Sequence, residues 1–230
     1  MKYSRNIAEL EEAKQQLLIQ KPLVYAYLGD EVKGAMVSGE AALAVVWSGD
    51  LMGLIYYPKS LRYIGDEEVC LVKNTKLKRV GVFVNEQPEM IAQRVKASCL
   101  SLIQLHGQES VGTCKELSQL VPVIKAFGIT NETDFSQTQP YEKVCSLFLF
   151  DTQTSAYGGS GKQFNWKSLE SYNGNTPFLL SGGISIKDVQ RIKKINHPML
   201  YGVDLNSCFE ITPGLKDINL LKQFIKEIKS

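Results

Sequence analysis

An acidic residue and a glycine-rich segment stand near each other in the second half of the chain. Asp151 directly follows an apolar run, residues 145–150, and the glycine-rich segment 158–162, with Gly159 inside it, comes soon after. A carboxyl group at the end of a buried strand is partly desolvated, which moves its pKa toward the working range of a general acid. Glycines allow the backbone to approach a ligand closely, or simply form a flexible lid. Asp151 is therefore the first candidate for proton transfer.

Two further turns have residues suited to binding an anion. Gly182 and Gly183 follow an apolar run, and the last apolar run ends in Asp204, Leu205, Asn206 and Ser207. Turns rich in small residues expose backbone N–H groups, which together with a helix N-terminus form a pocket for phosphate. The alternative is a pair of tight turns without a ligand, and the pairing of the two turns favours the phosphate pocket.

Cationic and imidazole side chains follow two other runs. Arg62 lies in a turn-forming segment, residues 57–63, where it could hold a substrate carboxylate through two parallel hydrogen bonds. A solvated basic loop is the alternative for that segment. Gln104 and His106 lie two residues apart at the end of another run, so they share one face of the strand. That face points either into a binding site or against helices, and His106 is as consistent with a structural role as with a catalytic one.

The elements that must position these residues form a regular alternation. Short apolar runs start about 20–30 residues apart, the spacing of a strand, a crossover helix and two loops. Eight such runs are predicted strands: 22–28, 51–57, 79–84, 101–105, 122–127, 145–150, 177–181 and 200–205. Eight β-α units predict a (β/α)8 TIM barrel, whose active site lies at the C-terminal ends of the strands. An open doubly wound sheet fits less well, because no G-x-G-x-x-G turn follows the first run.

One additional helix is expected outside this repeat. Residues 7–20 carry apolar side chains at helical spacing, and we expect a helical extension over residues 1–20 with a packing role. No linker rich in Pro, Gly or Ser divides the chain. We therefore expect one domain over residues 1–230.

Composition excludes several classes of protein. The chain has 26 Lys+Arg and 24 Asp+Glu, a balance that argues against a nucleic-acid-binding surface. Its apolar runs are too short to span a membrane, and its first residues do not read as a secretory signal. Five widely spaced cysteines predict free thiols in the cytoplasm, and two histidines exclude a multi-histidine metal site. We expect no metal, no nucleic-acid partner and no membrane contact.

The motifs, taken in order, resemble the phosphoribosylanthranilate isomerase family. They are GLIYYPKSLRY, VGVFVNE, IQLHG, PVIKAFG, FDTQTSAYGGSGKQFNW, LSGGI and YGVDLNSCFEITPGLKD. The resemblance implies a TIM barrel that performs an Amadori rearrangement in tryptophan biosynthesis without a cofactor. It also implies that Asp151 is the general acid and that Arg62 holds the anthranilate carboxylate. Gly182 with Gly183, and Asn206 with Ser207, match the phosphate site.

The first quarter of the chain departs from the family. The family's first strand ends in a K-[IV]-C-G motif whose cysteine is the general base, and no cysteine precedes Cys70 here. One alignment puts Leu28 at the base position, and another puts Lys33 there. Leucine cannot take a proton, whereas a desolvated Lys33, or a carboxylate from Asp30 or Glu31, could.

A second departure is Cys208, which stands where the family usually has a glycine beside the phosphate. It is expected to crowd that pocket rather than to replace the base.

Two functions follow from the resemblance. One is an active isomerase with a substitute base, Lys33, that binds a small phosphorylated substrate as a monomer or homodimer in the cytoplasm. The other is a weakened or inactive barrel that binds a phosphosugar or an anthranilate-like ligand. The presence of Asp151 favours the enzyme, and the absent cysteine favours the binding protein.

Overall fold

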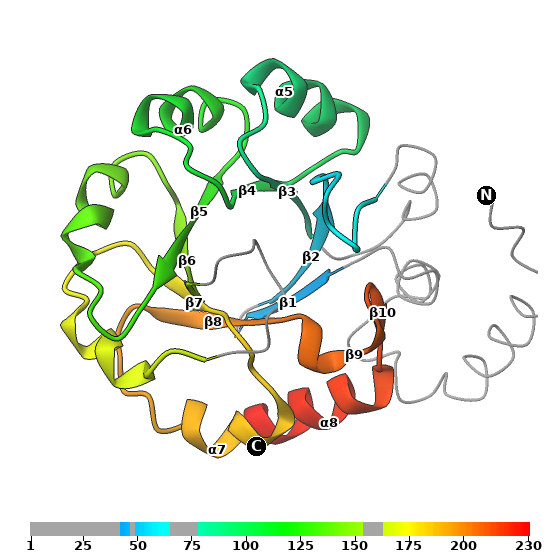
Figure 1. Cartoon of the computed structure of the whole chain (residues 1–230), viewed down its shortest axis with the longest axis vertical. Helices are drawn as coiled ribbons and strands as arrows, with labels where there is room; N and C mark the ends of the chain where they lie inside the picture. The colour runs from blue at the N-terminus through cyan, green and yellow to red at the C-terminus, as the bar shows by residue number, and fades with distance from the viewer. Residues whose placement is uncertain (1–41, 47–48, 65–77, 154–162) are drawn as a thin grey trace, which may run out of the picture.

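The computed structural model describes residues 42–46, 49–64, 78–153 and 163–230, which form a curled sheet with helices around it (Figure 1). Its strands, in order around a closed barrel, are β1 (Ala42–Val46), β2 (Gly49–Ile55), β3 (Lys78–Phe83), β4 (Leu102–Leu105), β5 (Val123–Ile129), β6 (Leu147–Thr152), β7 (Phe178–Leu180) and β8 (Leu200–Leu205). From β2 to β8 every neighbouring pair is parallel. The chain thus has an α/β fold like that of a TIM barrel, and the second to eighth predicted strands are confirmed.

The strand that closes this barrel differs from the expected repeat. β1 pairs antiparallel with both β2 and β8, so that Ala44 lies opposite Leu51 on one side and Asp204 on the other. Only residues 47 and 48 separate β1 from β2, and a parallel connection needs a dozen residues or more, so this pair has to be antiparallel. The predicted first strand, 22–28, and the predicted N-terminal helix, 7–20, lie outside the described residues.

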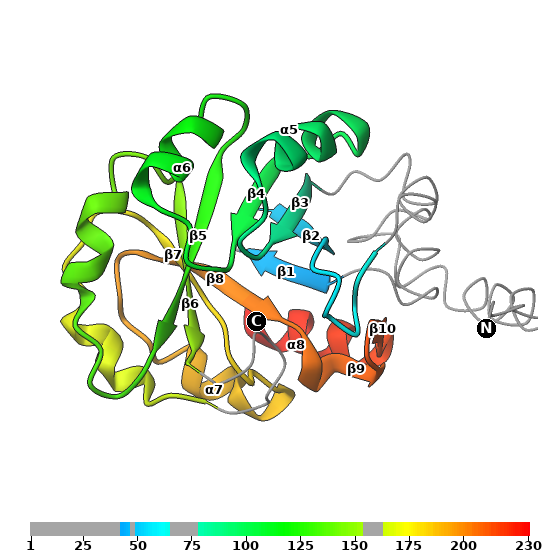
Figure 2. The same cartoon turned by 45° about the horizontal axis from the view of Figure 1, so that its top comes forward.

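Helices follow the strands on the outer side of the barrel (Figure 2). They are α5 (Pro88–Ala97), α6 (Val111–Leu117), η2 (Phe135–Tyr141), η3 (Trp166–Ser171), η4 (Ile186–Asp188), α7 (Val189–Ile192), η5 (Ser207–Phe209) and α8 (Ile218–Lys229), with a hairpin of β9 (Glu210–Thr212) and β10 (Leu215–Lys216) before the last helix. After β5 and β6 the described crossover elements are short 3-10 helices, where the repeat of β-α units predicted crossover helices.

The helix ends agree with the local sequence signals. Pro88 occupies the first turn of α5, where its missing N–H costs nothing. Asp188 accepts hydrogen bonds from the backbone N–H and the hydroxyl of Ser185, each at 2.8 Å, at the start of η4. Asp217 accepts from the backbone N–H groups of Asn219 and Leu220, each at 3.0 Å, and so begins α8.

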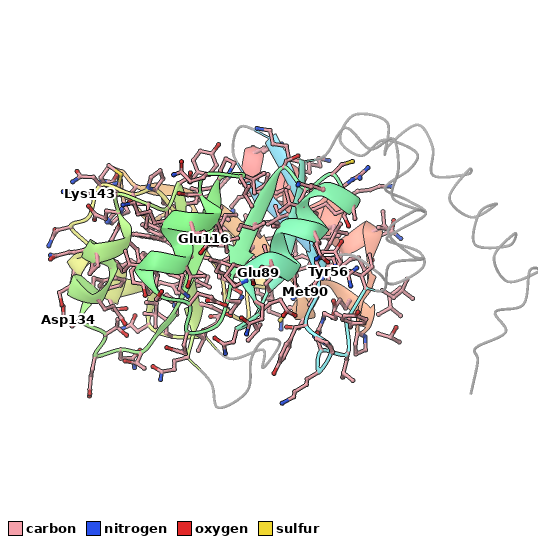
Figure 3. The ribbon with its side chains drawn as sticks, turned by 90° about the horizontal axis from the view of Figure 1, so that it is seen from above. Tyr56, Glu89, Met90, Glu116, Asp134 and Lys143 are labelled. Atoms are coloured by element: carbon pink, nitrogen blue, oxygen red, sulfur yellow. The ribbon has the colours of Figure 1, made fainter. Side chains whose placement is uncertain are left out.

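Two apolar layers stabilise the barrel. The interior is filled by alternate residues of β2 to β7, among them Leu51, Leu102 and Leu149. A larger layer lies between the sheet and the helices, and α8 buries Leu221, Phe224, Ile225 and Ile228 in it. Exposed polar residues, such as Glu89 on α5 and Glu116 on α6, cover the outside (Figure 3). This double burial explains why the strands are apolar on both faces.

Candidate active site

The mouth of the barrel is lined by the residues that follow the interior layer on each strand. Leu102, Leu149 and Leu179 fill the interior, and side chains two residues further along a strand point to the same face. The residues at these positions are Gln104 on β4, Asp151 on β6 and Ser181 after β7. The mouth also includes His106, two residues beyond Gln104, and Asp204 on β8. The alternation therefore directs Gln104 and His106 into the mouth rather than toward the helices.

His106 and Asp151 contact each other across the mouth. Nε2 of His106 lies 3.3 Å from Oδ2 of Asp151, and the side chains are 21% and 18% exposed. On the other side of the ring, Nε2 of Gln104 lies 3.0 Å from Nδ1 of His106. Because an amide nitrogen only donates, Nδ1 accepts, and the proton of the neutral ring then sits on Nε2, facing Asp151. Gln104 thus sets the tautomer with which His106 meets the carboxylate.

The other oxygen of Asp151 is held by the backbone. The N–H of Thr152 donates to Oδ1 at 2.8 Å. With one oxygen fixed by this bond and the other facing His106, the carboxyl group has a defined orientation while remaining accessible to a ligand. Such a group can deliver a proton to a substrate atom at the mouth.

Asp204 is a second carboxyl group at the mouth. The hydroxyl of Ser181 donates to its Oδ2 at 2.9 Å. Burial raises the pKa of Asp204, and the negative charge of Asp151 raises it further, whereas the Ser181 hydrogen bond, the Lys216 ammonium and His106 act in the opposite direction. The Asp151 charge is therefore close enough to Asp204 to favour the protonated form of Asp204. Ser181 was missed by sequence reasoning, although it ends the seventh predicted strand.

The turn after β7 depends on two glycines. Gly182 has φ +92° and Gly183 has φ +62°, both in the left-handed region that favours glycine. A Cβ atom on Gly182 would collide with Oγ1 of Thr152 and would come within 2.8 Å of the Thr152 backbone nitrogen and 3.0 Å of Oδ1 of Asp151. The turn therefore packs directly against the end of β6. The carbonyl of Gly183 accepts a weak hydrogen bond, at 3.6 Å, from the thiol of Cys208, which places Cys208 beside this turn as the sequence suggested.

A buried lysine holds the turn after β8. Nζ of Lys216 donates to the backbone oxygen of Asn206 at 3.1 Å and to its side-chain oxygen at 2.7 Å. The same ammonium lies 2.9 Å from Oε1 of Glu210, and the Lys216 side chain is 0% exposed. Ser207 begins the short helix η5 next to Asn206. The two predicted phosphate turns thus lie at the ends of adjacent strands.

Arg62 is held by a carboxylate that the sequence reasoning did not single out. Its Nε donates to both oxygens of Glu210, at 2.9 and 3.0 Å, and its Nη2 donates to Oε2 at 2.6 Å. Arg62 is therefore not the free cation of a solvated loop. The signal for Glu210 and Lys216 was present in the motif FEITPGLKD, but nothing in their spacing showed that both would be buried.

The loop after β4 rests on a second buried ion pair. Nζ of Lys125 lies 3.2 Å from Oε2 of Glu109 and donates to the carbonyls of Leu105 and Gly107 at 3.2 and 2.8 Å. Glu109 in turn accepts from the backbone N–H of Gly107 at 3.1 and 3.0 Å. This pair fixes the backbone on both sides of His106.

Several candidates lie outside the described residues. They are Lys33, Asp30, Glu31, Leu28 and Gly159. Within residues 42–46, 49–64, 78–153 and 163–230, no group of three or more His, Cys, Asp or Glu side chains could hold a metal ion. In the same ranges no helix has the length and apolar character needed to cross a membrane.

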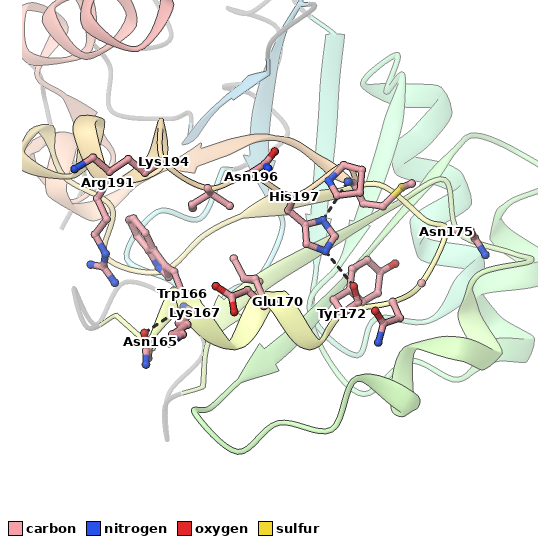
Figure 4. Close-up of a pocket in the computed structure, with 16 residues that line it drawn as sticks. Asn165, Trp166, Lys167, Glu170, Tyr172, Asn175, Arg191, Lys194, Asn196 and His197 are labelled. Carbon is pink, nitrogen blue, oxygen red and sulfur yellow. Dashed lines mark hydrogen bonds between the residues drawn. The ribbon is translucent and has the colours of Figure 1, made fainter.

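A cavity of about 790 Å³ lies along η3 on the outer side of the barrel (Figure 4). It is lined by η3 with the residues that follow it, and by residues 191–199 before β8, and none of the predicted site residues lines it. Two of its polar groups have partners: Nε2 of His197 lies 3.0 Å from the Tyr172 carbonyl, and Arg191 lies over the Trp166 ring at 4.0 Å. Among the described residues, the buried Nε1 of Trp166 has no hydrogen-bond partner. We place the candidate site at the mouth instead.

Comparisons with known proteins agree with the geometry. The family model of N-(5'-phosphoribosyl)anthranilate (PRA) isomerase matches residues 33–227. N-(5'-phosphoribosyl)anthranilate isomerases of Parabacteroides distasonis and Phocaeicola vulgatus are each 44% identical; the first match covers 82% of this chain and 86% of the relative, and the second covers 78% and 87%.

Solved structures give the same result. The crystal structure of phosphoribosyl anthranilate isomerase from Thermotoga maritima aligns with a TM-score of 0.69 and 36% identity, over 79% of this chain and 88% of that one. Another structure of this isomerase, in complex with reduced 1-(o-carboxyphenylamino)-1-deoxyribulose 5-phosphate, aligns at 0.66 and 32% identity, with the same coverage. The chain belongs to the N-(5'-phosphoribosyl)anthranilate isomerase family.

Proposed function

We propose that this chain isomerises N-(5'-phosphoribosyl)anthranilate to 1-(2-carboxyphenylamino)-1-deoxyribulose 5-phosphate in tryptophan biosynthesis, without a cofactor. The observation that carries the proposal is the placement of Asp151 at the mouth, oriented by Thr152 and facing His106. A protein that only bound a phosphosugar would have less need of an oriented acid beside its phosphate turn. The solved family structure holding the reduced product supports the choice of substrate.

In the proposed reaction Asp151 gives its proton to the furanose ring oxygen. The bond between that oxygen and C1 breaks, its electron pair stays on oxygen, and the anilino nitrogen forms a C=N bond to C1. A base then removes the proton from C2, and the pair from the C–H bond forms C1=C2 while the C=N electrons return to nitrogen. Finally the enol hydroxyl on C2 loses its proton and C1 gains one, which gives the ketose.

His106 and Asp204 assist this acid in the proposal. The Nε2 proton of His106 stabilises the Asp151 carboxylate once its proton has been transferred. Asp204 and Gln104 contact the sugar hydroxyls, and Gly159 also binds the substrate. Arg62 binds the anthranilate carboxylate, while Gly182, Gly183, Asn206 and Ser207 bind the phosphate.

Another residue has to act as the general base, because the family's cysteine is absent. We propose Lys33, with Asp30 and Glu31 as the alternatives. Ala42, the first residue of β1, pairs with Gly53 toward the mouth end of β2, and it follows Lys33 by nine residues. Nine residues span up to about 30 Å, so Lys33 has ample reach to the mouth.

We also propose the type of barrel, the extent of the domain, the cellular location and the oligomeric state. The seven parallel strands support a barrel derived from (β/α)8, in one domain over residues 1–230, with residues 1–20 as a helical extension. The protein acts in the cytoplasm as a monomer or homodimer, without nucleic acid or membrane partners. Limited proteolysis that releases only the first residues would support this arrangement.

The test is rescue of an isomerase-deficient tryptophan auxotroph, followed by assay of the purified chain. We expect rescue, and we expect Asp151→Asn to abolish it and to lower kcat by about 10²-fold to 10⁴-fold. The exposed Asp134→Asn is the matched control, because asparagine also serves as an N-cap at that position. No rescue, together with binding of the reduced product, would instead support the weakened binding protein, which the absent cysteine favours.

Single replacements then identify the base. We expect Lys33→Met to lower kcat strongly, while Asp30→Asn and Glu31→Gln retain activity. A loss confined to one of the carboxylates would transfer the role to it, and three fully active variants would exclude all three residues.

A further inference from the structure

Glu210 and Lys216 connect the two ends of the proposed substrate site. Glu210 accepts three hydrogen bonds from one edge of the Arg62 guanidinium, the edge formed by Nε and Nη2. Within the described part of the chain, no hydrogen bond engages Nη1. The guanidinium therefore keeps a second edge, Nη1 with the remaining Nη2 proton, with which to meet another carboxylate.

Lys216 continues the connection on the other side of Glu210. Its ammonium donates to Oε1 of Glu210 at 2.9 Å and to both oxygens of Asn206, at 2.7 and 3.1 Å. An ammonium has three protons, and these three acceptors use all of them. Gly214, with φ +85°, turns the β9–β10 hairpin so that its N–H also donates to Glu210, at 3.2 Å.

The charges of this cluster are consistent with a binding role. Burial raises the pKa of Glu210, but the hydrogen bonds from Arg62 and the charge of Lys216 outweigh burial and bring the pKa below its ordinary value. Burial lowers the pKa of Lys216, and the carboxylates of Glu210 and Asp204 oppose that shift. With Glu210 ionised between two cations, the cluster of Arg62, Glu210 and Lys216 carries one net positive charge. The cluster connects Arg62, which we propose binds the carboxylate, to Asn206, which we propose binds the phosphate.

We propose that Glu210 and Lys216 are positioning residues that set the direction of Arg62 and the place of the Asn206 turn relative to each other. Glu210 orients the guanidinium of Arg62 so that its second edge faces the aryl carboxylate. Lys216 fixes Glu210 relative to the Asn206 turn, which binds the phosphate. The pair thereby selects ligands that carry a carboxylate and a phosphate at one fixed separation. This inference rests on the proposed function.

The experiment compares two ligands by calorimetry. One is reduced 1-(o-carboxyphenylamino)-1-deoxyribulose 5-phosphate, and the other is the same molecule without the ring carboxylate. Glu210→Gln is expected to weaken the carboxylated ligand by about 10-fold to 100-fold and to change the other ligand less than about twofold. In turnover it should raise KM while kcat stays within about threefold, because the lost contact is made equally in ground and transition states.

Two further variants separate the two contacts of Lys216, the one with Glu210 and the one with Asn206. Asn206→Ala is expected to weaken both ligands by one common factor, since each needs the phosphate turn, and to preserve the preference for the carboxylate. Lys216→Met should weaken both ligands and also reduce the preference. If Lys216→Met does not fold, Glu210→Gln still tests the contact with Glu210, and Asn206→Ala still tests the contact with Asn206. Exposed Glu132→Gln and Lys226→Met are the matched controls.

The outcomes distinguish this inference from the function on which it rests. If the wild-type chain bound neither ligand, that result would contradict the proposed function itself. A wild-type chain that prefers the carboxylated ligand, with an unchanged preference in Glu210→Gln, would overturn the positioning role alone. Equal weakening of both ligands in Glu210→Gln would show a purely structural ion pair and would overturn it as well.

Discussion

At the scale of single residues, some groups that the proposed reaction needs lower the stability of the folded chain. Asp204 is the clearest case, because burial and the neighbouring Asp151 raise the pKa of its carboxyl group. A carboxyl whose pKa is higher in the folded than in the unfolded chain binds protons more tightly when folded. Stability is then greatest below the unfolded pKa of about 3.9 and falls as the pH rises through the folded pKa.

Asp204→Asn should therefore stabilise the protein near pH 7.5 and reduce its activity. The asparagine oxygen still accepts the Ser181 hydroxyl, while the cost of burying a charge disappears. Thermal unfolding at pH 7.5 and at about pH 4, close to the unfolded pKa, checks this, and the gain in Tm should shrink at the lower pH. A gain that is equal or larger at about pH 4 would mean that Asp204 is not the titrating group.

Gly182→Ala should damage the mouth through the backbone. A non-glycine residue in the left-handed region costs about 1–2 kcal/mol, and the added Cβ would also press on Thr152 and Asp151. We expect a loss of at least that size in urea unfolding, together with a rise in KM. Gly112→Ala on α6 is the control: its Cβ would meet only Oγ of Ser110, at 3.5 Å, so alanine there should be neutral or stabilising by about 0.5–1 kcal/mol.

At the scale of elements, strand ends and the loops after them position the catalytic groups, and buried ion pairs hold those loops. Lys125 on β5 binds carbonyls on both sides of His106, and its partner Glu109 binds the backbone N–H of Gly107 in the same loop. The lysine points outward from a strand whose alternate residues fill the barrel, so it contributes to the loop rather than to the mouth.

Lys125→Met should therefore destabilise the protein strongly. It leaves the Glu109 carboxylate buried without its cation, which typically costs about 3–5 kcal/mol. Urea unfolding measures this loss, and exposed Lys115→Met on α6 serves as the control with a change below about 1 kcal/mol. A loss for Lys125→Met as small as that of the control would show that the pair is not needed to hold the loop.

At the scale of the whole molecule, one aromatic cluster joins the sheet to its outer elements. Phe150 on β6 contacts Phe178 on β7 at 4.7 Å between ring centroids, Tyr172 at 5.1 Å and Phe135 of η2 at 5.1 Å. Since these rings belong to successive β-α units, they couple one part of the barrel to the next. Such coupling is what makes a single domain unfold as a unit.

Phe150→Ala should lower stability by about 3–5 kcal/mol, because it opens a cavity in this cluster. For a domain of this size each kcal/mol corresponds to about 2–4 °C in Tm. We expect circular dichroism and tryptophan fluorescence to report one coincident transition, shifted to lower temperature. Two separate transitions in the wild-type chain would contradict a single domain over residues 1–230.

The sequence by itself determined seven of the strands, the helix starts near Pro88, Ser185 and Ile218, and the main candidates at the mouth. This was possible because apolar runs, N-caps and glycine turns are local signals whose physical causes lie within a few residues. It also exposed the absent cysteine, which only a motif comparison could reveal.

Tertiary structure alone decided the pairing of β1 with β8, the contact between His106 and Asp151, and the partners of Arg62. These depend on contacts between residues far apart in the chain: Arg62 and Glu210 are separated by 148 positions. No local pattern records that a common lysine and glutamate will be buried together, because their burial is set by the elements that close over them. The raised pKa of Asp204 has the same origin, since it follows from burial and from a neighbouring carboxyl group on another strand.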